Sequence, residues 1–167
     1  SRVPGSGDDV VINCIPNFSP SLGERTYKSI VFPQSATCWD GSAFFKSGVK
    51  FITSSGDITG APNSLIADLQ SAGSIVFTNP WALNPDYNKL AGTWVAAGNI
   101  ALSDYYHGDE PLTMTVPSQV TCTNYTILGC IDFMFPGNAT IVNTLTITQN
   151  VDGFTNPGEI NVARCGE

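Results

Sequence analysis

The sequence has little charge. Asp, Glu, Lys and Arg make up only 13% of its 167 residues, about half of the ~25% that is usual in globular proteins. Seven Lys and Arg residues stand against 14 Asp and Glu residues, so the formal net charge is −7. The basic residues are scattered singly, so no basic stripe is present to neutralise a run of phosphates or to attract an anionic membrane surface. We therefore expect no nucleic acid among the partners of this protein.

Histidine, long apolar runs and metal-binding motifs are also scarce. The chain has one histidine, His107, and its five cysteines form no C-x-x-C pair, which argues against a structural zinc site. No run of 18 apolar residues occurs, so we expect no membrane insertion. A G-x-S-x-G nucleophile motif is absent too. The sequence therefore predicts a protein without cofactor or metal that is not an enzyme.

Thr, Ser and Asn are abundant in a chain that is still 42% hydrophobic. This length fits one domain with a real core. A surface rich in Thr, Ser and Asn and poor in Lys and Glu is typical of extracellular β proteins. We expect residues 1–9 to form a flexible or docking N-terminal arm, and residues 10–167 to form a single domain of a secreted, extracellular or surface-exposed protein.

Short runs of β-branched and aromatic residues, bounded by Gly, Pro, Asn and Asp, predict many strands. The clearest run is Thr140–Gln149, in which Thr residues alternate with mostly aliphatic ones, as a half-buried antiparallel strand requires. The predicted strands are Val10–Ile15, Tyr27–Phe32, Val49–Thr53, Ser74–Thr78, Thr93–Leu102, Leu112–Val116, Gln119–Ile127, Thr140–Gln149 and Ile160–Ala163. Their short spacing predicts an all-β, antiparallel β-sandwich of the jelly-roll or immunoglobulin-like type, without an internal repeat.

Two segments predict short helices in the connections. In Asn63–Gly73, Leu65, Ile66 and Leu69 share one helical face, and Gly73 is placed to end the helix. Asn84–Gly92 repeats this pattern with a proline at the first helical position.

The five cysteines favour disulfide bonds, which leave one thiol over. Cys122 and Cys130 flank a seven-residue segment and are expected to close a hairpin, and a bridge between Cys14 and Cys165 would tie the two ends of the chain together. Cys38 is then the odd cysteine. This pairing is one of several that the sequence permits.

Three N-x-[ST] sequons begin at Asn17, Asn124 and Asn138. In a secreted protein such sequons mark glycosylation sites in surface loops. The sequence composition, rich in Asn, Ser and Thr, also favours chance occurrences of this motif.

The densest polar cluster is the segment 104–110. His107, oriented by Asp104 or Asp109, is the candidate base of a small secreted hydrolase, which is one alternative function. Asp104, Asp109 and Glu110 are a weak calcium alternative, because the regular spacing of a calcium loop is missing.

Aromatic residues in loop contexts support a second alternative, a carbohydrate-binding module. Trp39, Trp81, Tyr105 and Tyr106 are its candidate binding residues, since aromatic faces stack on the apolar side of a sugar ring. Trp94 lies within a predicted strand and is expected in the core.

The leading hypothesis is a non-enzymatic extracellular structural or adhesion subunit that assembles with identical subunits into a filament, fibre or shell. A β-sheet with an open edge accepts a strand from a neighbour. The segment expected to donate or receive that strand contains Val10, Val11, Ile12, Cys14 and Ile15. Cys14 or Cys38 would then link subunits covalently.

Overall fold

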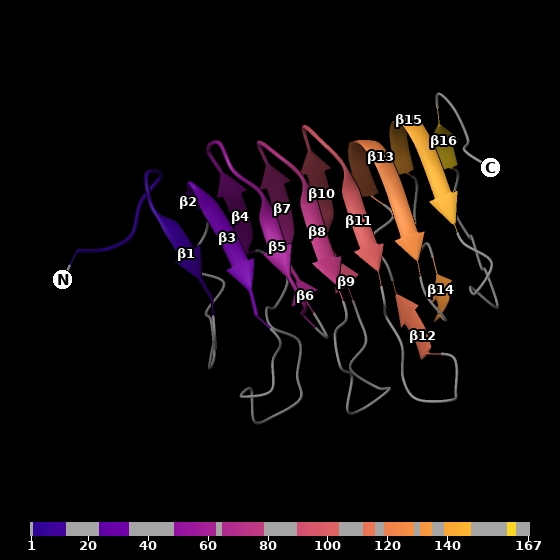
Figure 1. Cartoon of the computed structure of the whole chain (residues 1–167), viewed down its shortest axis with the longest axis horizontal. Helices are drawn as coiled ribbons and strands as arrows, with labels where there is room; N and C mark the ends of the chain where they lie inside the picture. Colours follow the sequence, from indigo (N-terminus) through magenta and orange to yellow (C-terminus); the bar gives the residue numbers. More distant parts are fainter. Residues whose placement is uncertain are drawn as a thin grey trace.

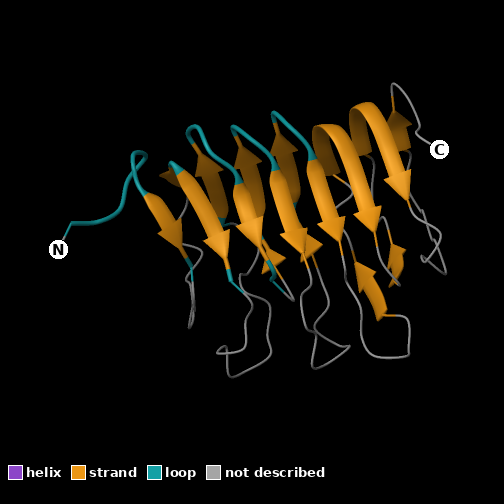
Figure 2. Ribbon diagram, in the orientation of Figure 1, coloured by secondary structure: helices purple, strands orange, loops and turns teal. Residues whose placement is uncertain are grey.

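The computed structural model describes residues 2–12, 24–33, 49–62, 65–78, 90–103, 112–115, 119–128, 131–134, 139–147 and 160–162. Every regular element in these residues is a strand, and no described helix has the length and apolar character needed to cross a bilayer (Figure 2). The strands are β1 (Asp9–Val11), β2 (Glu24–Tyr27), β3 (Ser29–Phe32), β4 (Lys50–Thr53), β5 (Ile58–Gly60), β6 (Leu65–Ile66), β7 (Asp68–Ser71), β8 (Ile75–Thr78), β9 (Leu90–Ala91), β10 (Thr93–Ala96), β11 (Ile100–Ser103), β12 (Leu112–Thr115), β13 (Gln119–Leu128), β14 (Ile131–Met134), β15 (Ala139–Ile147) and β16 (Ile160–Val162).

Twelve of these strands form one sheet in which every pairing is parallel. Ten strands follow the path β1-β3-β5-β8-β11-β13-β10-β7-β4-β2, and β15 and β16 extend it beyond β13. The long strand β13 pairs with β10 through its first half and with β11 through its second half. The sheet therefore folds back on itself at β13 into two faces and is nearly closed (Figure 1).

The register shows that the chain winds as a series of stacked coils. Ile30 lies opposite Ile58, and Ile58 lies opposite Ile75. Each such step moves to the next coil, because a parallel neighbour is reached only after the chain has crossed the other face and returned. In each full coil one strand belongs to the face of β2, β4, β7 and β10, and the next belongs to the face of β3, β5, β8 and β11. This architecture is a parallel β-solenoid.

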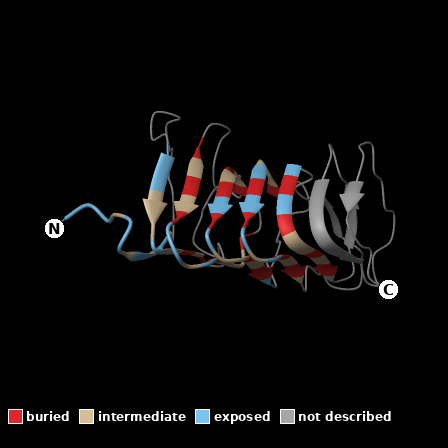
Figure 3. Cartoon of the chain, turned by 90° about the horizontal axis from the view of Figure 1, so that it is seen from above, coloured by how far each residue is buried: buried red, intermediate tan, exposed pale blue. Residues whose placement is uncertain are grey.

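Columns of apolar side chains fill the space between the two faces. Ile30, Ile58, Ile75 and Ile100 occupy successive positions of one column and are fully buried. Along strands such as β3, β8 and β10, buried residues alternate with more exposed ones (Figure 3). Because successive side chains of a strand point to opposite faces, one side of these strands forms the core and the other faces outward.

Aromatic residues pack against one another at the centre of this core. Trp94 on β10 is 0% exposed and its Nε1 donates a hydrogen bond to the carbonyl oxygen of Ala67 at 3.1 Å. Its ring meets the ring of Phe77 edge-on at a centroid distance of 5.4 Å, and Phe32 contacts Phe77 and Phe51 in the same way. The expectation that Trp94 belongs to the core is confirmed.

Two glycines lie where the backbone of one coil comes closest to that of the previous coil. Gly60 and Gly92 have φ values of 139° and 127°, which L side chains rarely adopt. A Cβ at Gly92 would lie 2.0 Å from the carbonyl oxygen of Ala67, and one at Gly60 would lie 1.8 Å from that of Phe32. Both positions therefore require glycine for conformation and for space.

The predicted antiparallel β-sandwich is wrong, because the main sheet is parallel throughout. Alternation of apolar and polar residues shows that a strand has one buried face, but it does not show the direction of its neighbours. Parallel sheets are commonly covered on both faces and then lack this alternation, whereas here the outward side of strands such as β8 and β11 stays partly exposed. The coils also leave no regular repeat in the sequence, because they differ in length.

The helix predicted over Asn63–Gly73 is wrong as well, since β6 and β7 occupy this segment. Leu65 and Leu69 are four residues apart, a spacing that fits one face of a helix and equally one side of a strand. The burial of Ala67 and Ser71 completes a period of two. In the second predicted helix, Asn84–Gly92, Leu90 and Ala91 form β9, and residues 84–89 lie outside the described residues.

Other differences concern strand boundaries. Tyr27–Phe32 is divided at Lys28 between β2 and β3, and Thr93–Leu102 is divided between β10 and β11. These breaks are the corners where the chain passes from one face of the solenoid to the other. The short strands β5 and β14 were not anticipated from the sequence.

Candidate functional site

Strand β1 lies at one end of the sheet path and pairs only with β3 among the described strands. It belongs to the segment that the sequence singled out for assembly, Val10 to Ile15. Val10, Val11 and Ile12 lie within the described residues. Their place at the end of the solenoid makes β1 an edge strand (Figure 1).

Apolar surface is left uncovered at this edge. Val11 is 62% exposed and Val3 in the preceding arm is 86% exposed. Val10 and Ile12 are only partly buried, whereas Ile30 and Phe32 in the same columns of the next coil are fully buried. The columns of the core therefore end in side chains that one further coil would cover.

The hydrogen bonds of β1 show which of its backbone groups are unused by β3. The backbone N–H of Ile12 donates to the carbonyl oxygen of Val31 at 2.9 Å. Since successive peptide groups of a strand point to opposite sides, the N–H of Val11 points away from β3. This group lies on the open edge, where the backbone of another strand can pair with it.

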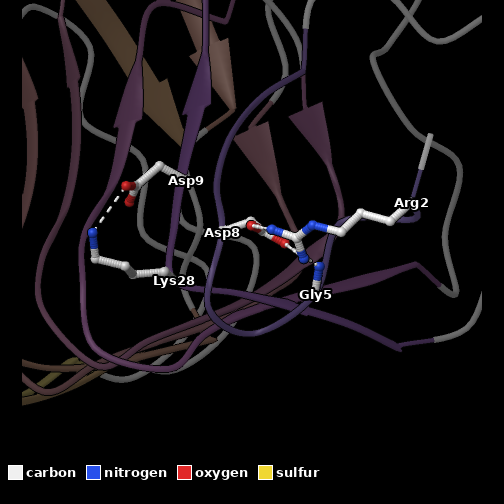
Figure 4. A network of polar contacts seen from close by, with 5 residues as sticks. All are labelled: Arg2, Gly5, Asp8, Asp9 and Lys28. Carbon is white, nitrogen blue, oxygen red and sulfur yellow. Dashed lines mark hydrogen bonds and ion pairs between the residues drawn. The ribbon is translucent and has the colours of Figure 1, made fainter.

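The arm before β1 is held by a small polar network (Figure 4). Asp8 accepts hydrogen bonds from the Gly5 backbone N–H at 2.8 Å and from the Arg2 guanidinium. The Gly5 bond, and then the Arg2 bond, hold the pKa of Asp8 below its ordinary value. Ser54, which lies between β4 and β5, also donates a hydrogen bond to the carbonyl oxygen of Ser6 at 2.7 Å. The arm is therefore bound to the corner between these two strands.

Asp9 at the start of β1 is neutralised by the following coil. Its carboxylate accepts hydrogen bonds from Ser29 Oγ at 2.6 Å and from Lys28 Nζ at 2.9 Å. The Ser29 bond, and then the Lys28 bond, lower the pKa of Asp9. The edge therefore carries a compensated ion pair, which removes the bare charge that would otherwise repel a neighbouring strand. The sequence did not predict the contacts of Asp9, because residues 1–9 were expected to form an arm. The only sequence feature that pointed to them is the pair of aspartates that precedes an apolar run.

Cys122 is a free, buried thiol on β13. Burial raises the pKa of this thiol to about 11, so it stays protonated near neutral pH. Cys130 lies outside the described residues. The free thiol of Cys122 argues against the expected disulfide between Cys122 and Cys130, and thiol labelling decides between the two.

Asn124, the first residue of one sequon, lies within β13 at a corner of the solenoid. Its Nδ2, the atom that would carry a glycan, donates a hydrogen bond to Asn99 Oδ1 of the preceding coil at 2.7 Å. The structure thus places this sequon within a strand, with its side chain hydrogen-bonded to the preceding coil, whereas glycosylation of Asn124 was expected in a loop.

The remaining candidate residues lie outside the described part of the chain. They are the assembly and disulfide residues Cys14, Ile15, Cys38, Cys130 and Cys165, the sequon residues Asn17 and Asn138, the aromatic residues Trp39, Trp81, Tyr105 and Tyr106, and the polar residues Asp104, His107, Asp109 and Glu110. Within the described residues, no group of three or more His, Cys, Asp or Glu side chains is arranged to hold a metal ion.

Comparison of the chain with protein-family models, with curated proteins and with solved structures finds no match.

Proposed function

We propose that this protein is a non-enzymatic extracellular structural or adhesion subunit, which assembles with identical subunits by strand addition at the β1 edge. The observation that carries this proposal is the open edge itself. Strand β1 pairs on one side only among the described strands, and its residue Val11 is 62% exposed. An open edge with exposed apolar residues is a template for pairing with another chain.

The surface next to this edge supports the same function. Outward positions along one face of the solenoid form a column that begins with Val11, Val31 and Thr59 and continues through Val76, Ala101 and Thr126. No member of this column is charged. A solenoid has a regular, repetitive surface and a stable shape, which suits a subunit whose task is to hold others in place.

The substitution Val11→Pro tests the proposal. Proline removes the N–H that points to the open edge, while the Ile12 N–H that pairs with Val31 is left in place. Sedimentation velocity of the full chain over a range of concentrations is expected to show species larger than 17.7 kDa for the wild type and only monomer for Val11→Pro.

Val76→Lys is the matched control. Val76 lies in the same outward column as Val11 but on β8, which pairs with strands on both sides. Strand addition at the edge predicts that this variant associates like the wild type. A wild type that stays monomeric at every concentration would overturn the proposal, and so would loss of association in Val76→Lys with retention in Val11→Pro.

A further inference from the structure

The two ends of the described solenoid are offset by half a coil. At the N-terminal end, β1 extends the face of β3 by one strand, while β2 is the last strand of the other face. At the opposite end, the first half of β15 pairs with β16, while its second half pairs with β13 alone among the described strands. One end therefore carries an extra strand on one face, and the other end carries an extra strand on the other face (Figure 1).

The registers make these two half coils continuous with each other. The column that starts at Val11 ends at Thr146 on β15, and the column that starts at Val10 ends at Leu145. On the other face, a single column runs from Thr26 on β2 to Asn161 on β16. These three columns thus end at positions where a strand of the same direction would continue them.

From this fit we infer that a second copy of the chain stacks head to tail, with its β1 against the second half of β15 and its β2 against β16. The extra strand β16 of one copy and the extra strand β1 of the next then complete one full coil. All pairs across the joint are parallel, as they are inside the subunit. This inference rests on the proposed self-assembly and specifies its partner and geometry.

A second copy fits the joint better than an unrelated strand does. A single added strand would cover β1 but would leave the edge of β2 open, whereas a second solenoid covers both edges at once. At the joint, the positions of Thr146, Val11, Asn161 and Thr26 are uncharged. Asp9 is already paired with Lys28, and Glu24 on β2 with Lys50. Arg25 on β2, which is exposed in the single subunit, is the one basic side chain that the edge of β2 brings to the joint. Head-to-tail contacts of this kind do not close on themselves, so the product is a filament.

The stack has a defined repeat. Seven strands lie along each face: β1, β3, β5, β8, β11, β13 and β15 on one, and β2, β4, β7, β10, β13, β15 and β16 on the other. With about 4.8 Å between neighbouring strands, each subunit adds about 34 Å of filament length. Electron microscopy with mass-per-length measurement of the wild-type chain is expected to find 17.7 kDa for each such repeat.

Complementation of two blocked variants tests the polarity of the joint. Val11→Pro blocks the β1 end, and Asn161→Lys places a charge on the terminal strand β16, a substitution that disfavours strand addition. Each variant alone is expected to be monomeric, whereas an equal mixture is expected to form dimers, because the free β16 end of the first accepts the free β1 end of the second. Circular dichroism spectra that match the wild type show that both variants fold.

The outcomes separate this inference from the proposed function. Filaments with the stated repeat and dimers in the mixture support head-to-tail stacking. A wild type that stops at a closed dimer, or a mixture that stays monomeric, overturns the stacking but leaves self-association through β1 standing. A wild type that is monomeric throughout overturns both.

Discussion

At the scale of single residues, Cys122 has the largest shift of a side-chain pKa in the described part of the chain. It is 1% exposed, and burial raises the pKa of its thiol to about 11 from an ordinary value of 9.0. The thiolate is the reactive form of cysteine, so Cys122 is protected twice, by its protonation and by the surrounding core. We therefore expect it to be inert in the folded protein.

Labelling with iodoacetamide at pH 8, followed by peptide mass spectrometry, checks this prediction. Cys122 is expected to stay unmodified in the native chain and to react after denaturation without reductant. Rapid native labelling would contradict the burial, and a reaction that needs reductant would show a disulfide instead of a free thiol. The raised pKa also implies that the free energy of unfolding decreases as the pH rises from about 9 to about 11. In this range the unfolded chain releases the thiol proton, whereas the folded chain keeps it.

At the scale of elements, the corner between β4 and β5 depends on two buried hydroxyl groups. Thr53 Oγ1 donates to the carbonyl oxygen of Gly56 and accepts a hydrogen bond from the backbone N–H of Ala72 at 3.0 Å. Ser71 Oγ lies 3.3 Å away in the next coil and donates to the carbonyl oxygen of Ser74 at 3.0 Å. These hydroxyls satisfy backbone groups that the turn itself leaves unpaired, which buried turns require.

The substitution Thr53→Val tests this role. Valine has nearly the same shape but leaves the Ala72 N–H without its acceptor, so we expect a loss of about 1–3 kcal/mol in the free energy of unfolding. Thr59→Val, at an outward position of β5, is the control and is expected to change it by less than about 0.5 kcal/mol. Urea denaturation followed by circular dichroism measures both, and equal effects of the two substitutions would refute the role of the corner hydroxyl.

At the scale of the whole molecule, stability is distributed along a stack in which each coil pairs only with its neighbours. The free energy of such a stack is close to a sum of terms for the coils and for the contacts between them. Central strands such as β8 and β11 gain contacts on both sides, whereas β1 pairs with only one of the described strands. Opening is therefore expected to begin at the N-terminal end and to move inward.

Native-state hydrogen exchange of the Val11→Pro variant, whose end is free, measures this gradient. We expect amide protection to rise along the face from β1 through β3 and β5 to β8 and β11. Uniform protection over these five strands would show that they unfold as one unit and would contradict the sequential opening. In wild-type filaments, the protection of β1 is expected to approach that of β3.

The sequence alone determined that the protein is built mainly of strands and much of the inward and outward alternation, although it also predicted a helix where β6 and β7 lie. Buried Ile30, Ile75 and Trp94 lie in segments that their β-branched and aromatic content marked as strands, because each local choice agrees with a half-buried strand. The sequence also predicted that the segment around Val10 donates or receives a strand, and this stays a prediction. It did not reveal the pairing of Asp9 with Lys28 and Ser29, because these partners lie about twenty residues further along the chain.

Only the tertiary structure decided the direction of the strands and the winding of the chain. A buried face on each strand is compatible with parallel and antiparallel neighbours alike, and the choice depends on where distant segments meet. The same reason applies to Leu65 and Leu69, whose spacing fits a helix as well as a strand. The strand forms because the previous coil pairs with β7: the carbonyl oxygen of Val49 accepts a hydrogen bond from a backbone N–H of β7, and Phe51 lies opposite Leu69. The half-coil offset of the two ends is likewise a property of the stack, which no single segment of the sequence contains.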